Sequence, residues 1–344
     1  MDLHLLEQTL ADRGEPPFRA RQIWRWAAAG AEGYAEMTDL PAALREMLTR
    51  ELPFSSLTVR AEARSGDGTV KALFHTADER PLEAVLMRYR DGRRSICVSS
   101  QSGCPLTCTF CATGRMRFAR NLTASEIVEQ ALYFKRLERA PQGPPPVTNC
   151  VFMGMGEPML NLDNVLAACE RLPDIGITHR RMAISTVGWI PGIERLAEQD
   201  LPVRLALSLH AADDALRSQL MPVNERFPIA DVIEACRAFY ERRRRRVFIE
   251  YVMLAGVNDR YEQALALART LSAPREGEPP IFKVNLIPYN PTGANGNDPY
   301  RGSTRESIAA FRAALESRGI PATVRLTRGR DIDAACGQLA ARSG

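Results

Sequence analysis

The sequence predicts an α/β protein whose main domain is a partial, six-stranded parallel barrel. From residue 95 onward, short runs rich in β-branched residues alternate with helical segments, and about six such units follow one another. Strands that alternate with helices pair in parallel through right-handed crossovers. A closed barrel of this kind needs eight units, so the sheet is expected to stay open.

Composition favours a large globular protein and argues against a membrane protein or a disulfide-rich secreted protein. The chain has 344 residues, of which 45% are hydrophobic, which suits one barrel with extensions or two domains. The formal net charge is only +4, so charge alone does not predict a nucleic-acid partner. The first twenty residues hold four acidic side chains, and no apolar run reaches the roughly 18 residues of a membrane span. We therefore expect a cytoplasmic protein without membrane association, whose eight cysteines serve metal binding or catalysis and not a disulfide framework.

Residues 1–60 are predicted to form a helical domain. Its amphipathic stretches are 18–30 and 41–52, and the first carries interleaved basic and aromatic residues: Arg19, Arg21, Trp24, Arg25 and Trp26. From these residues alone two interpretations stay open, a small bundle with the tryptophans in its core or an RNA-binding surface. Residues 61–95 are predicted to be a β-hairpin connector, with Asp-Gly turns at 67–68 and 91–92.

The barrel is predicted to span residues 96–320, its first strand beginning at the boundary. Strands are expected in the segments 95–100, 147–154, 181–186, 203–210, 247–254 and 282–289. The first helix opens at a capping box, in which the side chains of Thr123 and Glu126 satisfy free amides of the first turn. Residues 321–344 add a further strand at 322–327 and a tail that contains Cys336.

Polar or reactive residues follow the carboxyl ends of five of these strands. The cysteine-rich segment 103–111 follows the first strand, and the segment 154–158 follows the second. Residues 185–186, 208–210 and 290 stand at the ends of three more. In barrel-like α/β folds, the loops after the carboxyl ends of strands carry the functional residues. The pattern therefore predicts one shared site at this edge of the sheet.

Cys104, Cys108 and Cys111 are the strongest candidates for metal ligands. Their C-x₃-C-x₂-C spacing occurs once, whereas structural zinc sites usually combine two cysteine or histidine pairs. Three thiolates can hold a 4Fe-4S cluster through three irons, which leaves the fourth iron open to another ligand. A zinc site completed by a distant cysteine or histidine, or a coincidence of spacing, stays open as an alternative.

The segment 154–158, Gly-Met-Gly-Glu-Pro, is a candidate cofactor site. Gly154 and Gly156 are expected to let the backbone approach a ligand closely. Glu157 can accept hydrogen bonds from an ammonium group or a ribose hydroxyl. The alternative is an ordinary turn between a strand and a helix.

The remaining cysteines divide into two groups. Three lie in apolar periodic stretches and are predicted to be buried: Cys150, Cys169 and Cys236. Cys97 lies seven residues before the three-cysteine motif, and Cys336 lies in the tail. Three arginines precede Cys336: Arg325, Arg328 and Arg330. Their charge is expected to lower the pKa of the Cys336 thiol and to favour the nucleophilic thiolate.

The cysteine spacing, with Phe110 directly before the last cysteine, resembles that of the radical S-adenosylmethionine (radical SAM) superfamily. Further motifs together resemble the RlmN family of dual-specificity RNA adenine-C2 methyltransferases: GEPPFRARQIWRW, EMTDLP, CVSSQSGCPLTCTFCATG, NLTASEIVEQ, VFMGMGEPMLN, STVG, SLHA, LIPYNP and RGRDIDAACGQL. The resemblance runs from about residue 14 to 340. It implies a partial radical SAM barrel, an N-terminal helical RNA-binding domain of the helix–hairpin–helix type, and a short C-terminal extension.

The resemblance also implies cofactors and ligands. The three motif cysteines would hold one 4Fe-4S cluster, whose open iron binds S-adenosylmethionine (SAM). The matched SAM contacts are Gly156, Glu157, Ser185, Ser208, Leu209, His210 and Asn290. Two SAM molecules would be used per turnover. From the residues alone, His210 could equally be a structural histidine at a strand end.

The resemblance further implies how the methyl group is transferred. Cys336 would take a methyl group from one SAM by displacement. A radical derived from the second SAM would remove a hydrogen from that group, and the methylene radical would add to adenine C2. Cys97 would then attack the sulfur of Cys336, forming a transient disulfide and releasing the product. Glu83 matches the proton acceptor, although a strand carboxylate alone would be expected to be solvated.

The implied substrates are the peptidyl-transferase-centre adenine of 23S rRNA and an adenine beside the anticodon of certain tRNAs. An electron-donating flavoprotein or other reductase is implied as a partner, and we expect a monomer. Two alternatives stay open, Cfr-type methylation of C8 of the same rRNA adenine and a metal-stabilised RNA-binding protein without catalysis. The five arginines at 242–246 either bind phosphates or form a solvated helix end.

Overall fold

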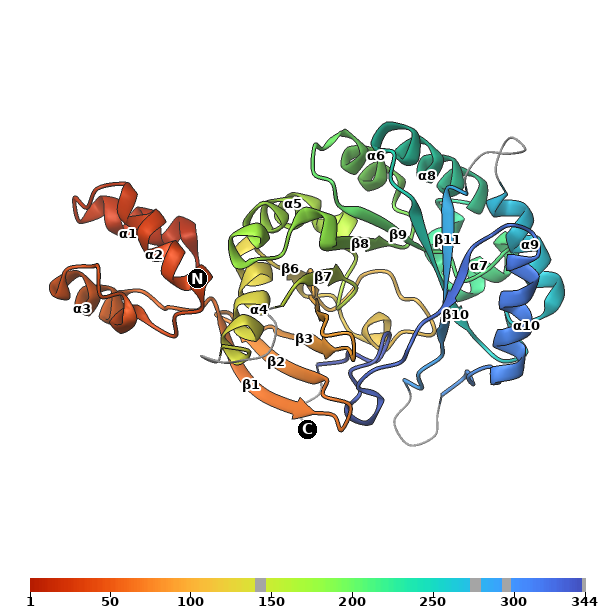
Figure 1. The fold of residues 1–344 in the computed structure, drawn as a ribbon, viewed down its shortest axis with the longest axis horizontal. Coiled ribbons are helices and arrows are strands. Elements are labelled where there is room, and N and C mark those ends of the chain that lie inside the picture. Colours follow the sequence, from red (N-terminus) through yellow and green to blue (C-terminus); the bar gives the residue numbers. More distant parts are fainter. Residues whose placement is uncertain (140–146, 273–279, 293–297, 342–344) are drawn as a thin grey trace.

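The computed structural model describes residues 1–139, 147–272, 280–292 and 298–341. Figure 1 shows an open α/β barrel with a helical lobe projecting from one side. One ten-stranded sheet runs in the order β1-β2-β3-β4-β7-β8-β9-β10-β11-β12. All pairs from β4 to β12 are parallel, whereas β1 to β4 pair antiparallel. The structure therefore confirms the predicted partial barrel.

All six predicted barrel strands are present, and the strand predicted at 322–327 joins the same sheet as a seventh parallel member. Their bounds are β4 (Arg94–Cys97), β7 (Asn149–Phe152), β8 (Met182–Thr186), β9 (Arg204–Ser208), β10 (Val247–Met253), β11 (Phe282–Pro288) and β12 (Ala322–Val324). β8 is buried at all five positions, as is usual for a parallel strand that is covered on both faces.

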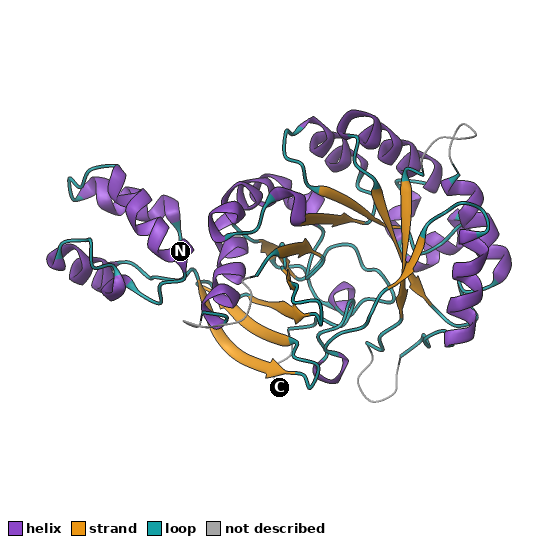
Figure 2. Cartoon of the chain, viewed as in Figure 1, coloured by secondary structure: helices purple, strands orange, loops and turns teal. Residues whose placement is uncertain are grey.

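Helices cover the outside of the parallel strands, as Figure 2 shows. Their bounds are α4 (Ala124–Leu137), α5 (Leu162–Arg171), α6 (Ile190–Glu198), α7 (Asp214–Leu220), α8 (Ile229–Arg243), α9 (Tyr261–Leu271) and α10 (Arg305–Glu316). The predicted capping box of α4 is confirmed. The Glu126 amide donates to Thr123 Oγ1 at 3.2 Å, and the Thr123 amide donates to Glu126 Oε2 at 2.9 Å. Two amides that would otherwise lack partners are thereby satisfied.

The antiparallel part consists of β1 (Leu57–Arg64), β2 (Val70–Thr76) and β3 (Pro81–Arg88). The predicted turns are confirmed, with Gly68 and Gly92 at φ of +86° and +80°. The helical prediction to residue 60 is wrong at its end, because residues 57–60 belong to β1. This edge strand is mostly exposed and rich in charged residues, so it lacks the apolar alternation that marks a half-buried strand.

The helical lobe contains α1 (Leu3–Asp12), α2 (Phe18–Ala29) and α3 (Ala42–Glu51). Trp24 is only 7% exposed, and its indole N–H donates to Asp174 of the barrel at 2.6 Å. The Met1 ammonium group pairs with Glu129 of α4. Trp24 therefore packs as a core residue and joins the lobe to the barrel. None of the described helices is long and apolar enough to cross a membrane.

A buried arginine links the loops that follow β8 and β9. Arg217 of α7 is 0% exposed. Its guanidinium donates to the carbonyls of Val187 at 2.5 Å, of Leu209 at 3.2 Å and of Phe227 at 3.2 Å, and to Asn224 Oδ1 at 2.7 Å. Burial lowers the pKa of Arg217 to about 10, and the neighbouring Cys108 and Asp214 act in the opposite direction. The Arg217 side chain therefore holds the loops behind the carboxyl edge of the sheet together through its hydrogen bonds.

Replacing Arg217 should destabilise the fold. We expect Arg217→Met to lower the free energy of unfolding by about 3–5 kcal/mol, because four buried acceptors would lose their donor. The control is Arg312→Met on α10, which removes only an exposed pair with Glu316 and should cost about 0.3–0.5 kcal/mol. Denaturant unfolding followed by circular dichroism measures both. Equal stability of the two variants would contradict the role given to Arg217.

Candidate active site

Polar side chains of four adjacent strands lie together, at the ends of β8 and β9 and in the middle of β10 and β11. Ser185 Oγ and Ser208 Oγ lie 3.3 Å apart, as expected for one shared site. Ser208 pairs in register with Glu250 of β10, and Asn285 Nδ2 of β11 donates to Glu250 Oε1 at 2.7 Å. Glu250 and Asn285 are buried and were not predicted. The available signal was a single carboxylate within the apolar strand 247–254.

Gly154 and Gly156 both lie tightly against other parts of the protein, and their approach to a ligand stays a prediction. A Cβ on Gly154 would lie 2.7 Å from Ser99 Oγ, and one on Gly156 would lie 2.4 Å from Gln101 Cβ. Gly156 also has a φ of +95°, which other residues rarely adopt. Both glycines therefore hold the 154–158 turn against the segment after β4.

This packing places Glu157 inside the site. Its amide donates to Gln101 Oε1 at 2.9 Å, while its carboxylate accepts from the amides of Met159 at 3.1 Å and Val187 at 3.0 Å. Burial raises the pKa of Glu157 to about 7, against the lowering effect of these hydrogen bonds. Negative charge on Glu157 in turn raises the pKa of Cys104 and Cys108. The carboxylate therefore lies beside the three-cysteine loop, where it can accept bonds from a ligand.

The loop that carries Cys104, Cys108 and Cys111 leaves all three partly exposed. Gly114 allows the chain to pass closely, because a Cβ there would lie 2.6 Å from the Cys108 carbonyl oxygen. Burial first, and then the neighbouring thiolates, raise the pKa of Cys108 well above its usual value. Three thiolates here would concentrate negative charge that a cationic iron centre offsets.

The donor set, three free thiols on one loop, has the chemistry of an iron–sulfur cluster site. A 4Fe-4S cluster is held by thiolates that bind different irons. Among the described residues, no group of three histidine, cysteine or acidic side chains is placed to hold a single metal ion.

His210 and Leu209 are held by β10. His210 has a left-handed backbone with a φ of +59°, and its Nδ1 accepts from the Val252 amide at 3.0 Å. Burial lowers the pKa of His210 to about 3, so the ring is neutral. Its ring meets that of Phe110 edge-on at 4.8 Å between centroids. Leu209 is buried, and its amide donates to the Glu250 carbonyl at 3.1 Å. His210 thus connects the end of β9 to the cysteine loop, and Leu209 connects it to β10.

The tail returns to this edge, where hydrogen bonds hold the segment around Cys336. Asn290 Nδ2 donates to the Cys336 carbonyl at 3.3 Å, and Gln338 Nε2 donates to the Pro291 carbonyl at 2.9 Å. The Ala112 amide, directly after Cys111, donates to the Gly337 carbonyl at 2.8 Å. Asn290 therefore contacts the tail, and the tail contacts the cysteine loop.

Cys97 and Cys336 are brought together although 239 positions separate them in the chain. Burial raises the pKa of Cys97 to about 12, and the adjacent Cys336 contributes to the rise. Cys336 is exposed as a residue, yet the loss of water around its thiol, Glu250 and Cys111 raise its pKa to about 12. The predicted lowering is wrong, because only Arg325 of the three arginines acts on the thiol and burial outweighs it.

Glu83 of β3 anchors the tail. It is 1% exposed, so the expectation of a solvated carboxylate is wrong. Its Oε2 accepts from the amides of Ala340 at 2.9 Å and Ala341 at 3.0 Å, and Lys71 Nζ lies 3.0 Å from its Oε1. Lys71 Nζ also donates to the Asp333 carbonyl at 3.3 Å. The carboxylate therefore joins the antiparallel strands to the segment that carries Cys336.

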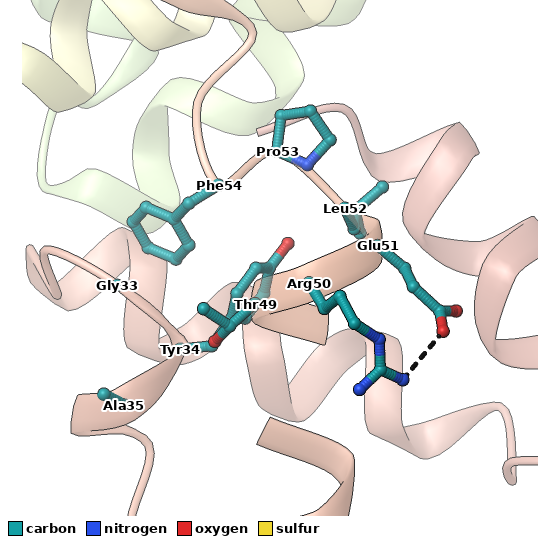
Figure 3. A pocket seen from close by; sticks show the side chains of 9 residues that line it. All are labelled: Gly33, Tyr34, Ala35, Thr49, Arg50, Glu51, Leu52, Pro53 and Phe54. Atoms are coloured by element: carbon teal, nitrogen blue, oxygen red, sulfur yellow. Dashed lines mark hydrogen bonds and ion pairs between the residues drawn. The ribbon is translucent and has the colours of Figure 1, made fainter. Parts of the chain in front are cut away.

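The other cysteines and the hollow in the lobe lie outside this arrangement. Cys150, Cys169 and Cys236 are buried, as predicted. A hollow of about 450 Å³ lies in the helical lobe (Figure 3), lined by Tyr34, Phe54 and the ion pair of Arg50 with Glu51 among others. It contains none of the predicted site residues.

Comparison with known proteins identifies relatives along the whole chain. Residues 98–268 match the model of the radical SAM superfamily, and residues 1–52 match that of the ribosomal RNA large subunit methyltransferase N-terminal domain. A probable dual-specificity RNA methyltransferase RlmN from Chloroflexus aurantiacus is 49% identical and covers 99% of this chain and 92% of its own. The dual-specificity RNA methyltransferase RlmN of an Anaeromyxobacter species is 47% identical, covering 100% and 90%.

A solved structure agrees with these sequence relatives. The crystal structure of a radical SAM methyltransferase from Sphaerobacter thermophilus superimposes with a TM-score of 0.91 at 45% sequence identity. The match covers 99% of this chain and 98% of the other. The similarity therefore includes the helical lobe, the sheet and the tail.

The Glu83 anchor makes a prediction about the tail. We expect Glu83→Ala to speed amide hydrogen exchange in residues 329–341 by about 10- to 100-fold, because loss of a charge-assisted hydrogen bond costs about 1.5–3 kcal/mol. Glu83→Gln keeps an acceptor oxygen and should have a smaller effect. Glu62→Ala on β1, which is separated from β3 by β2, is the control. Hydrogen exchange with mass spectrometry measures all three, and an unchanged tail in Glu83→Ala would contradict the anchor.

Proposed function

The chain belongs to the RlmN family of dual-specificity RNA methyltransferases within the radical SAM superfamily, and on this premise we propose that it forms 2-methyladenosine in 23S rRNA and in tRNA. The proposed targets are adenine 2503 of the peptidyl-transferase centre and adenine 37 beside the anticodon. One observation carries the proposal. Cys336 lies near enough to Cys97 to add to the burial that raises the pKa of Cys97, and the tail beside Cys336 is bonded to the three-cysteine loop, where the Ala112 amide donates to the Gly337 carbonyl at 2.8 Å.

The proposed division of the chain follows its chemistry. With the bounds corrected to the observed strands, residues 1–56 would form the RNA-binding domain, 57–93 the connector, 94–320 the barrel and 321–344 the extension with Cys336. Arg21 and Arg25 of α2 are exposed and supply charge for RNA phosphates. An enzyme acting on a base edge needs the base unstacked, so the adenine enters the barrel mouth singly. We propose a cytoplasmic monomer that receives electrons from a flavoprotein or other reductase.

The cofactors follow from superfamily membership, because the radical SAM superfamily uses SAM and a 4Fe-4S cluster. We assign cluster binding to Cys104, Cys108 and Cys111. Glu157 would accept bonds from the amino group of SAM, and Ser185, Ser208 and Asn290 would contact the rest of the molecule. Gly156, Leu209 and His210 would shape the pocket. When bound, this pair supplies a radical that removes a hydrogen atom from a methyl group, and two SAM molecules serve each turnover.

The two remaining cysteines would perform the transfer. The Cys336 thiolate would attack the methyl carbon of a SAM molecule, so that a new carbon–sulfur bond forms as the bond from this carbon to the sulfonium sulfur breaks and S-adenosylhomocysteine leaves. After the methylene radical has added to adenine C2, the adduct would give up the C2 proton and its unpaired electron, and the cofactor system that supplied one electron would take this one back. The Cys97 thiolate would then attack the Cys336 sulfur. The S–S bond forms, and the electron pair of the breaking carbon–sulfur bond goes to the methylene carbon, which takes a proton and becomes methyl. The disulfide is then reduced by cellular thiols.

Glu83 is proposed to accept the proton that leaves adenine C2. Its carboxylate already lies next to the tail, since the Ala340 and Ala341 amides donate to it. Lys71 would balance its charge while the proton moves. The same residue would therefore both hold the tail and serve the step that follows methylene addition.

Nucleoside analysis tests the proposed function. We expect the reconstituted protein, with SAM and a reductant, to convert the target adenine of a 23S rRNA fragment to 2-methyladenosine, detected by mass spectrometry. Cys104→Ala should abolish the product, because one cluster ligand is missing. Formation of 8-methyladenosine would assign the protein to Cfr-type chemistry. Failure to form either nucleoside in the iron-loaded protein would reject the proposal.

Removal of Cys97 should trap the reaction midway. We expect Cys97→Ala to accumulate a covalent protein–RNA adduct, because no thiol remains to attack the Cys336 sulfur. A shifted band in a denaturing gel that disappears after nuclease treatment would detect it. Cys169→Ala, which changes a buried cysteine of α5, is the control and should give free product. Full turnover by Cys97→Ala would refute the role of that thiol.

A further inference from the structure

Six cations gather at the amino ends of the central strands, at the end of the sheet opposite the candidate active site. Arg204 begins β9, Arg246 directly precedes β10, and Lys283 is the second residue of β11. Arg244 and Arg245 precede Arg246, and Arg180 lies in the turn before β8. Phe248 pairs in register with Lys283 and with Ala206 of β9, which aligns these ends side by side. We call this group the arginine cluster.

The cluster surrounds a hollow of about 510 Å³. Five of its six members line it (all but Arg180), together with Tyr240, Phe248 and Pro280. The Arg204 guanidinium stands over the Phe248 ring at 5.5 Å from its centroid. Guanidinium groups beside aromatic rings are the side chains with which proteins bind phosphates and stack on bases. The hollow therefore has the chemistry of a nucleic-acid contact.

The cations of the arginine cluster have no acidic or hydrogen-bonding side-chain partner in the described parts of the chain. No ion pair and no side-chain hydrogen bond joins any of the six to another described residue, although the adjacent Arg243 pairs with Asp200 at 3.3 Å. Burial and the charges of Arg180, Arg204 and Arg243 lower the pKa of Arg245. Unpaired arginines also occur singly elsewhere on the surface. Here they repel one another around a hollow, and an external anion would relieve that repulsion.

We propose that the arginine cluster binds the phosphate groups of an RNA segment remote from the target adenine. The proposal rests on the proposed function, which makes a large folded RNA the substrate. β10 has seven residues between the two ends of the sheet, or roughly 20 Å at about 3.3 Å per residue. An RNA with several helices can reach both ends at once. A minimal stem-loop whose loop is bound at the barrel mouth cannot also reach the arginine cluster at the opposite end of the sheet.

The test compares two triple variants of the full-length protein. The cluster variant combines Arg204→Gln, Arg246→Gln and Lys283→Gln. The control combines Arg269→Gln, Arg305→Gln and Arg318→Gln, three exposed arginines that lie on α9, on α10 and directly after α10, and loses the same charge. Filter binding measures the Kd for a domain-length 23S rRNA fragment and for a minimal stem-loop with the same adenine, over a range of salt concentrations.

We expect the cluster variant to bind the long RNA about tenfold more weakly than the control and its slope of log K against log salt to fall by about 2, since each lost phosphate contact removes about 0.7–0.9. Its Kd for the stem-loop should match that of the control. Equal Kd values of the two variants for the long RNA would overturn the proposal.

A second measurement separates RNA from free phosphate compounds. Inorganic triphosphate is titrated into wild-type protein and the cluster variant by calorimetry. If triphosphate binds only the wild type while long-RNA binding is unchanged in the variant, the site serves a free polyphosphate and the RNA assignment is wrong. The binding results decide this question even if no methylated nucleoside is ever formed, so the failure of each proposal can be recognised separately.

Discussion

The Arg217 guanidinium is the interaction on which the carboxyl edge of the sheet depends. Four acceptors from three separate stretches of chain converge on one buried cation, and each would otherwise be an unsatisfied polar group in the interior. Two of them, the carbonyls of Val187 and Leu209, belong to loops that also carry candidate ligand contacts. Because Val187 in turn donates its amide to Glu157, the position of that carboxylate follows from the arginine behind it.

A second layer of contacts assembles the site from segments that are remote in sequence. Parallel strands place Ser185, Ser208 and Glu250 in one row, and the tail then closes over them from the far end of the chain. Cys336 would stand apart from Cys97 without that closure. The fold thereby brings Cys336, from the far end of the chain, to the edge at which Cys97 and the three-cysteine loop lie.

Much of the fold follows from local pattern, and less of the site does. Strand–helix alternation, the Thr123 capping box and the Asp-Gly turns are short-range signals, and each is confirmed. The start of β1 was not predicted, because an exposed edge strand has no buried face that would require apolar and polar residues to alternate. Glu83 and Glu250 could not be placed by the residues around them, because their burial depends on the tail and on adjacent strands. The pKa of Cys336 was misjudged for the same reason, since nearby arginines were visible in the sequence and surrounding protein was not.

The Glu83 anchor has a consequence for the folding and motion of the molecule. Its bond to Ala340 spans 257 of the 344 positions, about three quarters of the chain, so the contact can form only after both the hairpin and the barrel exist. Few apolar side chains hold the tail compared with the sheet. Segments of this kind open locally at a lower free energy than the core. Cys336 therefore lies on a part of the protein that can open and close while the sheet stays folded.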